Sequence, residues 1–161
     1  LIVGEPSGEA TPRVQKLVEL LNAAGIDTTL SPQIQKDVWF KLWGNMTVNP
    51  ISALTGCTTD LIMDDDYVRG FISAVMLEAK EIGRRIGIEI TQSPEDRHAI
   101  TKKLGAFKTS MLQDVEAGRS VELDALVTVV RELGELTAVA TPFTDALLGL
   151  ARLRTRQLGL Y

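Results

Sequence analysis

The chain has 161 residues and a net charge of −4 at pH 7, with 45% hydrophobic and 24% charged residues. This balance is typical of a soluble globular protein and excludes long disordered stretches. Nucleic acid is excluded as the main partner because phosphate binding needs a basic surface, and membrane insertion because no apolar run approaches the roughly 20 residues that cross a bilayer. The single cysteine, Cys57, cannot form an internal disulfide, so we expect a protein of the reducing cytoplasm.

Residues 1–30 have the pattern of a strand, a helix and a second strand. An apolar run opens the chain without a signal-peptide pattern. Thr11-Pro12 combines a capping hydroxyl with a proline at the first helical position, and Gly25 ends that helix. Residues 26–30 alternate at strand spacing. Because a lone strand is not stable, we interpret this segment as the last part of a larger α/β domain, a remnant of a longer chain.

Residues 31–161 are predicted to be entirely helical. One apolar stretch runs from Pro32 to about Thr55, in one or two pieces, and Asp66 is expected to cap a long helix that ends near Gly87. Ser93-Pro94 is a strong start signal for the next helix. Further helices are expected over 108–116, 122–138 and 142–158. The predicted fold is therefore mainly α, with an all-helical domain over 31–161 behind a short α/β unit over 1–30.

A polar stripe lies on the first of these helices. Lys41, Asn45 and Asn49 are four residues apart, and each such step returns within about 40° of the same direction, with a rise of about 6 Å. Asparagine is a poor residue for a helix interior, so two of them beside a lysine favour a binding site for a polar ligand. The alternative is an ordinary solvated face, which is common on helices.

The residues around the stripe argue against a solvated face. Trp39, Trp43 and their neighbours are apolar around most of the helix, which predicts that it is buried and that its polar groups have partners. Pro50 removes a helical hydrogen bond to residue 46. We therefore expect the helix to kink or end there, and a pocket to form at the break.

A second polar segment surrounds a predicted turn at Gly118. Ser110 begins the sequence Ser-Met-Leu-Gln-Asp on one side, and Glu122 and Asp124 follow on the other. By themselves these acids are explained by capping, because carboxylates are favoured in the first turn of a helix.

Together the two segments resemble the carboxy-terminal domain of the ketopantoate reductase (2-dehydropantoate 2-reductase) family. Its pattern is W-x-K-L-x-x-N-x-x-x-N-P, then S-M-L-Q-D and a hydrophobic residue, then G-R and an acid pair. The similarity extends over essentially the whole chain, including Thr141-Pro142. Thr109 and Val121 depart from the usual serine and threonine. The Gly-rich strand–turn–helix with which the family binds NADPH is not in this sequence.

The resemblance implies a helical domain of the 6-phosphogluconate-dehydrogenase C-terminal-like type behind a Rossmann remnant. It also implies NADPH-dependent reduction of 2-dehydropantoate to pantoate, on the route to pantothenate and coenzyme A. Lys41 would be the proton donor, and Asn45, Asn49 and Ser110 would bind substrate. Glu122 would contact a substrate hydroxyl or the nicotinamide ribose. NADPH would be bound mainly by the missing amino-terminal half, so this fragment alone is expected to be inactive.

Two alternatives stay open. The protein could reduce another 2-oxo acid, or the helical domain could be a non-catalytic dimerisation module whose polar stripe is vestigial. In either case the helical domain is a candidate homodimer interface. No metal site is expected, because His98, predicted to be exposed, has no companion ligands. Cys57 is interpreted as a packing thiol, and Trp39 and Trp43 as core residues.

Overall fold

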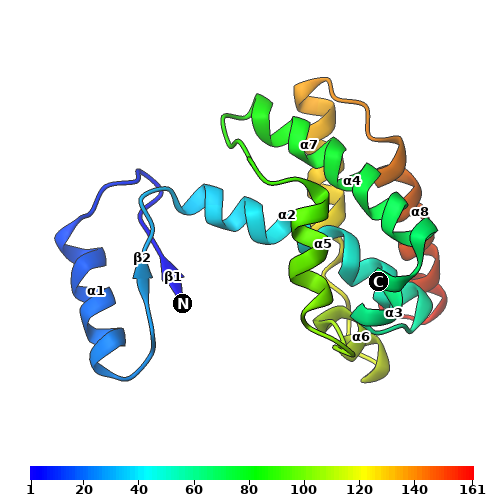
Figure 1. The fold of residues 1–161 in the computed structure, drawn as a ribbon, viewed down its shortest axis with the longest axis horizontal. Coiled ribbons are helices and arrows are strands. Elements are labelled where there is room, and N and C mark those ends of the chain that lie inside the picture. The colour runs from blue at the N-terminus through cyan, green and yellow to red at the C-terminus, as the bar shows by residue number, and fades with distance from the viewer. The chain divides into compact units, whose positions relative to one another are not determined.

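Residues 1–41 form the first of two structural units in the computed structural model, which describes residues 1–161 (Figure 1). Strand β1 (Ile2–Val3) pairs in parallel with β2 (Thr29–Leu30), and α1 (Pro12–Ala23) connects them. The Thr11 side chain caps α1 by accepting from Val14 N at 3.3 Å, and Gly25 follows the helix with a φ of 80°. The predicted strand–helix–strand order is therefore confirmed.

The second strand is shorter than predicted. The side-chain amide of Asn22 holds Thr28 at both backbone groups, accepting from its N–H at 3.0 Å and donating to its carbonyl at 2.9 Å. These bonds make residues 26–28 part of the turn that leaves α1, so strand pairing begins only at Thr29.

Residues 42–161 form the second unit, which is all-helical as predicted. Helix α4 is its longest complete helix and packs against α3, α5, α7 and α8; Figure 1 shows α4 and α7 lying side by side. No helix is both long and apolar enough to cross a bilayer. After α2 (Ile34–Thr55), which begins in the first unit, come α3 (Thr59–Asp64), α4 (Asp66–Arg85), α5 (Pro94–Lys102), α6 (Ser110–Glu116), the π-helical turn η1 (Asp124–Thr128), α7 (Val129–Thr137) and α8 (Pro142–Gln157).

The core of this unit forms around the second half of α2. Trp43 is 1% exposed, and its indole N–H donates to the Met76 carbonyl of α4 at 2.7 Å. At the other end of the helix, Ala53 joins a buried cluster with residues of α6, η1 and α8. Full burial of a large aliphatic side chain contributes about 1.5–3 kcal/mol. These contacts therefore fix α2 strongly within the unit.

The predicted extent of α2 to Thr55 is confirmed, but the helix does not end at Pro50, because the burial of residues 46–53 outweighs one missing backbone hydrogen bond. Two other predicted boundaries were wrong. Helix α4 is capped by Asp65, which accepts from Val68 N at 2.9 Å, and not by Asp66. The helix predicted over 122–138 begins instead with the π-helical turn η1, and the short α3 was not predicted.

His98 was predicted to be exposed, and this was also wrong. It is 8% exposed, because α5 packs its inner face against α3 and α4. Burial lowers the pKa of His98 below its ordinary value of 6.5, while the nearby Glu95 opposes that change. The predicted start of α5 is confirmed: Ser93 and Asp96 cap each other's backbone N–H groups.

Helix α8 begins at Pro142, as predicted, but its cap comes from a distant residue. The Glu78 carboxylate on α4 accepts from Phe143 N and Thr144 N, both at 2.9 Å, and from the Thr144 hydroxyl at 2.6 Å. A carboxylate at a helix N-terminus satisfies free N–H groups and interacts favourably with the helix dipole. This contact ties α8 to α4.

We predict that replacing Glu78 by alanine lowers the free energy of unfolding by about 2 kcal/mol, because charge-assisted hydrogen bonds are lost at the start of α8. Denaturant titration of the variant measures this. Glu132→Ala, at an exposed glutamate of α7, is the matched control and should change little. Equal effects of the two substitutions would show that the Glu78 cap contributes nothing.

We also predict that stability falls as the pH is lowered through 6.5. The unfolded chain binds a proton at His98 more readily than the folded chain, whose pKa there is lowered by burial. Unfolding free energies of the protein and of His98→Gln, measured above and below that pH, test this. If lowering the pH reduces the free energy of unfolding of the protein no more than that of His98→Gln, then His98 is not a buried neutral imidazole.

Candidate functional site

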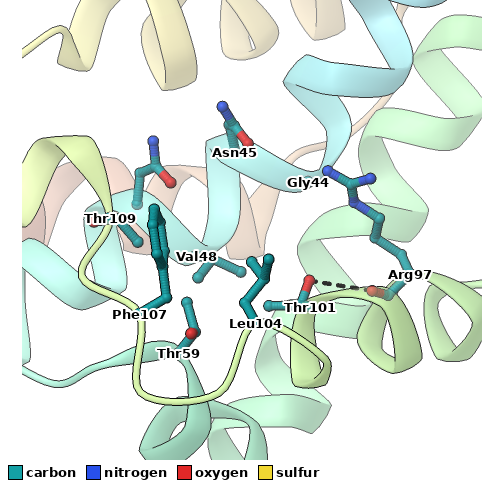
Figure 2. A pocket seen from close by; sticks show the side chains of 10 residues that line it. Gly44, Asn45, Val48, Thr59, Arg97, Thr101, Leu104, Phe107 and Thr109 are labelled. Atoms are coloured by element: carbon teal, nitrogen blue, oxygen red, sulfur yellow. Dashed lines mark hydrogen bonds between the residues drawn. The ribbon is translucent and has the colours of Figure 1, made fainter.

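The second half of α2 lines a small pocket of about 90 Å³ (Figure 2). Asn45 is half-buried and Asn49 is 7% exposed, and both face this pocket. Amide side chains in such a position offer donors and acceptors to a ligand. The remaining lining residues come from α2, α3, α5 and the loop before α6: Gly44, Val48, Thr59, Arg97, Thr101, Leu104, Phe107 and Thr109.

Ser110 follows the pocket-lining residue Thr109 and lies 61 residues after Asn49 in the chain. The Asn49 side-chain amide lies 3.5 Å from the Ser110 hydroxyl, at the outer limit of a hydrogen bond. Thr109 places Ser110 by capping α6, where its hydroxyl accepts from Leu112 N at 3.2 Å. Of the three residues predicted to bind substrate, Asn45 and Asn49 therefore line the pocket, and Ser110 lies next to Asn49.

Two of the predicted site residues, Lys41 and Glu122, do not line this pocket. Lys41 is an exposed residue of α2 and the last residue of the first unit, one helical turn before Asn45 along the chain. Glu122 is exposed and precedes η1, where its carbonyl accepts from Leu126 N at 3.2 Å, and it does not line the pocket. The roles of both residues stay predictions.

Arg97, the charged residue among those that line the pocket, was not predicted from the sequence. Its guanidinium lies against α2 at Gly44, where a β-carbon would come within 2.7 Å of the Arg97 Cζ. Burial lowers the pKa of Arg97, although an arginine stays protonated at neutral pH. A glycine inside a buried helix was the available signal, because it often marks a close approach.

The pocket therefore offers polar groups to a small ligand. One guanidinium, two carboxamides and three threonine hydroxyls line it together with apolar side chains, and no carboxylate does. Such a set can hold an acid group and a hydroxyl while excluding water from the apolar side. No group of three or more histidine, cysteine, aspartate or glutamate side chains converges where it could hold a metal ion.

The connection between β1 and α1 differs from a dinucleotide-binding turn. The connection from β1 to α1 lacks the Gly-rich turn that cradles a pyrophosphate at a helix N-terminus. Glu5 in this connection accepts hydrogen bonds from Arg13 and Thr11. These bonds lower the pKa of the Glu5 carboxyl group.

Residues 33–155 match the family model described as ketopantoate reductase PanE/ApbA C terminal. A curated 2-dehydropantoate 2-reductase from Mesorhizobium japonicum is 43% identical over 99% of this chain and 49% of its own length. The chain thus spans about half the length of the curated relatives it matches.

Solved structures show the same similarity. A structure from Ralstonia solanacearum, provisionally assigned as a ketopantoate reductase, has a TM-score of 0.95 at 54% identity, over 99% of this chain and 49% of that chain. The 2-dehydropantoate 2-reductase of Methylococcus capsulatus has a TM-score of 0.90 at 30% identity, over 98% and 51%. A D-mandelate dehydrogenase with NADH and anilino(oxo)acetate shares the fold at 19% identity, with a TM-score of 0.88 over 98% and 67%.

We predict that Asn49→Leu leaves the free energy of unfolding unchanged or raises it by up to about 1 kcal/mol. The bond to Ser110 is long, and a buried amide that awaits a ligand does not stabilise the empty protein. Denaturant titration checks this. Ser52→Ala on the same helix is the control and should lose about 1 kcal/mol, because the fully buried Ser52 donates to the Cys57 carbonyl at 2.7 Å. A larger loss for Asn49→Leu would make its amide a structural group.

Proposed function

This chain belongs to the ketopantoate reductase family, and we propose that it is the carboxy-terminal part of an enzyme that reduces 2-dehydropantoate to pantoate with NADPH. The observation that carries the proposal is that Asn45 and Asn49 line one pocket beside α2, while Ser110, from a distant motif, lies next to Asn49. Pantoate formation serves pantothenate and coenzyme A synthesis, and we place the enzyme in the cytoplasm. The chain alone, without a dinucleotide cradle, is proposed to be inactive.

The chemistry assigns separate tasks to the residues of this chain. NADPH, when held mainly by the other half of the enzyme, supplies a hydride to the carbonyl carbon of the substrate. The carbonyl oxygen then gains negative charge and needs a proton, which Lys41 donates while its ammonium stabilises that charge. The amides of Asn45 and Asn49, with the Ser110 hydroxyl, hold the substrate's carboxylate and hydroxyl groups. Glu122 contacts a substrate hydroxyl or the nicotinamide ribose.

Two other functions are compatible with membership of the family. The enzyme could act on a different 2-oxo acid, because the amides and hydroxyls named here would bind the acid group of any such substrate. The helical domain could also act only as a dimerisation module. The module is excluded if turnover depends on Lys41 and Asn49, whereas a comparison of substrates distinguishes the two reductases.

We predict that Lys41→Ala in the full-length enzyme lowers turnover of 2-dehydropantoate by about 10² or more, because the proton donor is lost. Steady-state NADPH oxidation measures this. Lys36→Ala removes another exposed lysine of α2 and should leave the rate unchanged. A near-normal rate for Lys41→Ala would rule out its role as the acid.

A further inference from the structure

The chain turns back after α8 and is bonded to the segment that precedes η1. Gly159, with a φ of 73°, donates its N–H to the Arg156 carbonyl at 2.9 Å, and Leu160 N donates to the Thr155 carbonyl at 2.8 Å. This pair of bonds ends α8 at a left-handed glycine and reverses the chain. The Leu160 carbonyl then accepts from Val121 N at 3.1 Å, and the Leu160 side chain is buried. Residues 159–161 are therefore fixed at both ends of this turn.

A second attachment joins the side chains of the same two segments. The Tyr161 hydroxyl donates to Asp124 Oδ1 at 2.6 Å, and the Thr128 hydroxyl donates to the same oxygen at 2.8 Å. These bonds, first that from Tyr161, lower the pKa of Asp124, and the bond to Asp124 raises the pKa of Tyr161. At neutral pH the carboxylate is therefore ionised and the phenol protonated, so the bond between them is charge-assisted.

Glu122 lies between these two attachments. Its neighbours Val121 and Leu123 are buried in the hydrophobic cluster to which α8 also contributes, whereas the Glu122 side chain is exposed. Asp124, two residues further on, begins the π-helical turn η1, and such turns often occur at functional sites. The backbone of Glu122 is thus held from both sides while its carboxylate is accessible, as a residue that binds a ligand in a fixed geometry requires.

We propose that Tyr161 is a positioning residue for Glu122. Through its bond to Asp124, Tyr161 fixes the turn that carries Glu122, and so sets where the Glu122 carboxylate meets the substrate hydroxyl or the nicotinamide ribose. This inference rests on the proposed function, and in particular on the role predicted there for Glu122. It assigns a task in the reaction to the segment after α8, which contributes no residue to the pocket beside α2.

Steady-state kinetics of the full-length enzyme test this. Glu122→Gln should raise the KM for 2-dehydropantoate or for NADPH, according to which of the two Glu122 contacts. Tyr161→Phe should raise the same constant by about 3- to 10-fold, the effect expected from one lost hydrogen bond. Thr128→Val removes the other donor to Asp124 and should act in the same direction. Tyr67→Phe, which removes the hydroxyl of a 92% exposed tyrosine of α4, is the matched control and should change neither constant.

The double variant separates positioning from a purely structural role. If Tyr161 acts through Glu122, adding Tyr161→Phe to Glu122→Gln should raise the affected KM no further. A purely structural role would lower the free energy of unfolding and leave both KM values unchanged.

Unchanged KM values in Tyr161→Phe, or additive effects in the double variant, would overturn this inference and leave the reduction of 2-oxo acids standing. The same holds if Glu122→Gln changes neither KM, because Glu122 then contacts neither ligand. Failure of the unmodified enzyme to reduce any 2-oxo acid would instead remove the proposed function.

Discussion

The second half of α2 is packed on every side, and the other features of the second unit follow from this constraint. From Met46 to Ala53 every residue is buried, so this stretch must present apolar or satisfied groups in all directions. Thr47 achieves this with a bond to the Gly44 carbonyl, Ser52 with a bond to the chain just beyond the helix, and Asn49 only with a long contact to Ser110. The amide of Asn49 is therefore the least well satisfied of the three, at the point where a pocket opens.

The helices around α2 bring chemically different groups to that pocket. Helix α5 contributes a guanidinium and the Thr101 hydroxyl, α3 the Thr59 hydroxyl and the segment before α6 the Thr109 hydroxyl. Helix α2 itself contributes two amides. Two of the helices beside the pocket are anchored by their own caps, at Ser93 for α5 and at Thr109 for α6. A site built on capped helices keeps its geometry better than one built on loops, which agrees with recognition of a small polar acid.

Local signals in the sequence predicted much of the fold. Thr11-Pro12, Gly25 and Ser93-Pro94 marked helix ends correctly, because caps act within a few residues. Pro50 does not end α2 as its local effect predicted, because burial of the surrounding helix outweighs that effect. The cap of α8 by Glu78 could not be predicted, because it joins residues that are distant in the chain. The burial of His98 could not be predicted either, because it depends on which face of α5 packs inward.

For the site, helical spacing and the family resemblance predicted Asn45, Asn49 and Ser110. The contact between Arg97 and Gly44 could not be predicted, because it joins two helices that are distant in the chain.

We propose that this chain supplies the substrate-binding part of a 2-dehydropantoate reductase. The most direct test is to express it with the upstream half of its reading frame and to follow NADPH oxidation optically with 2-dehydropantoate, pyruvate and 2-oxoisovalerate in turn. We expect turnover that strongly favours 2-dehydropantoate. A folded protein that binds NADPH yet reduces none of the three would contradict the claim, and equal turnover of all three would contradict its specificity.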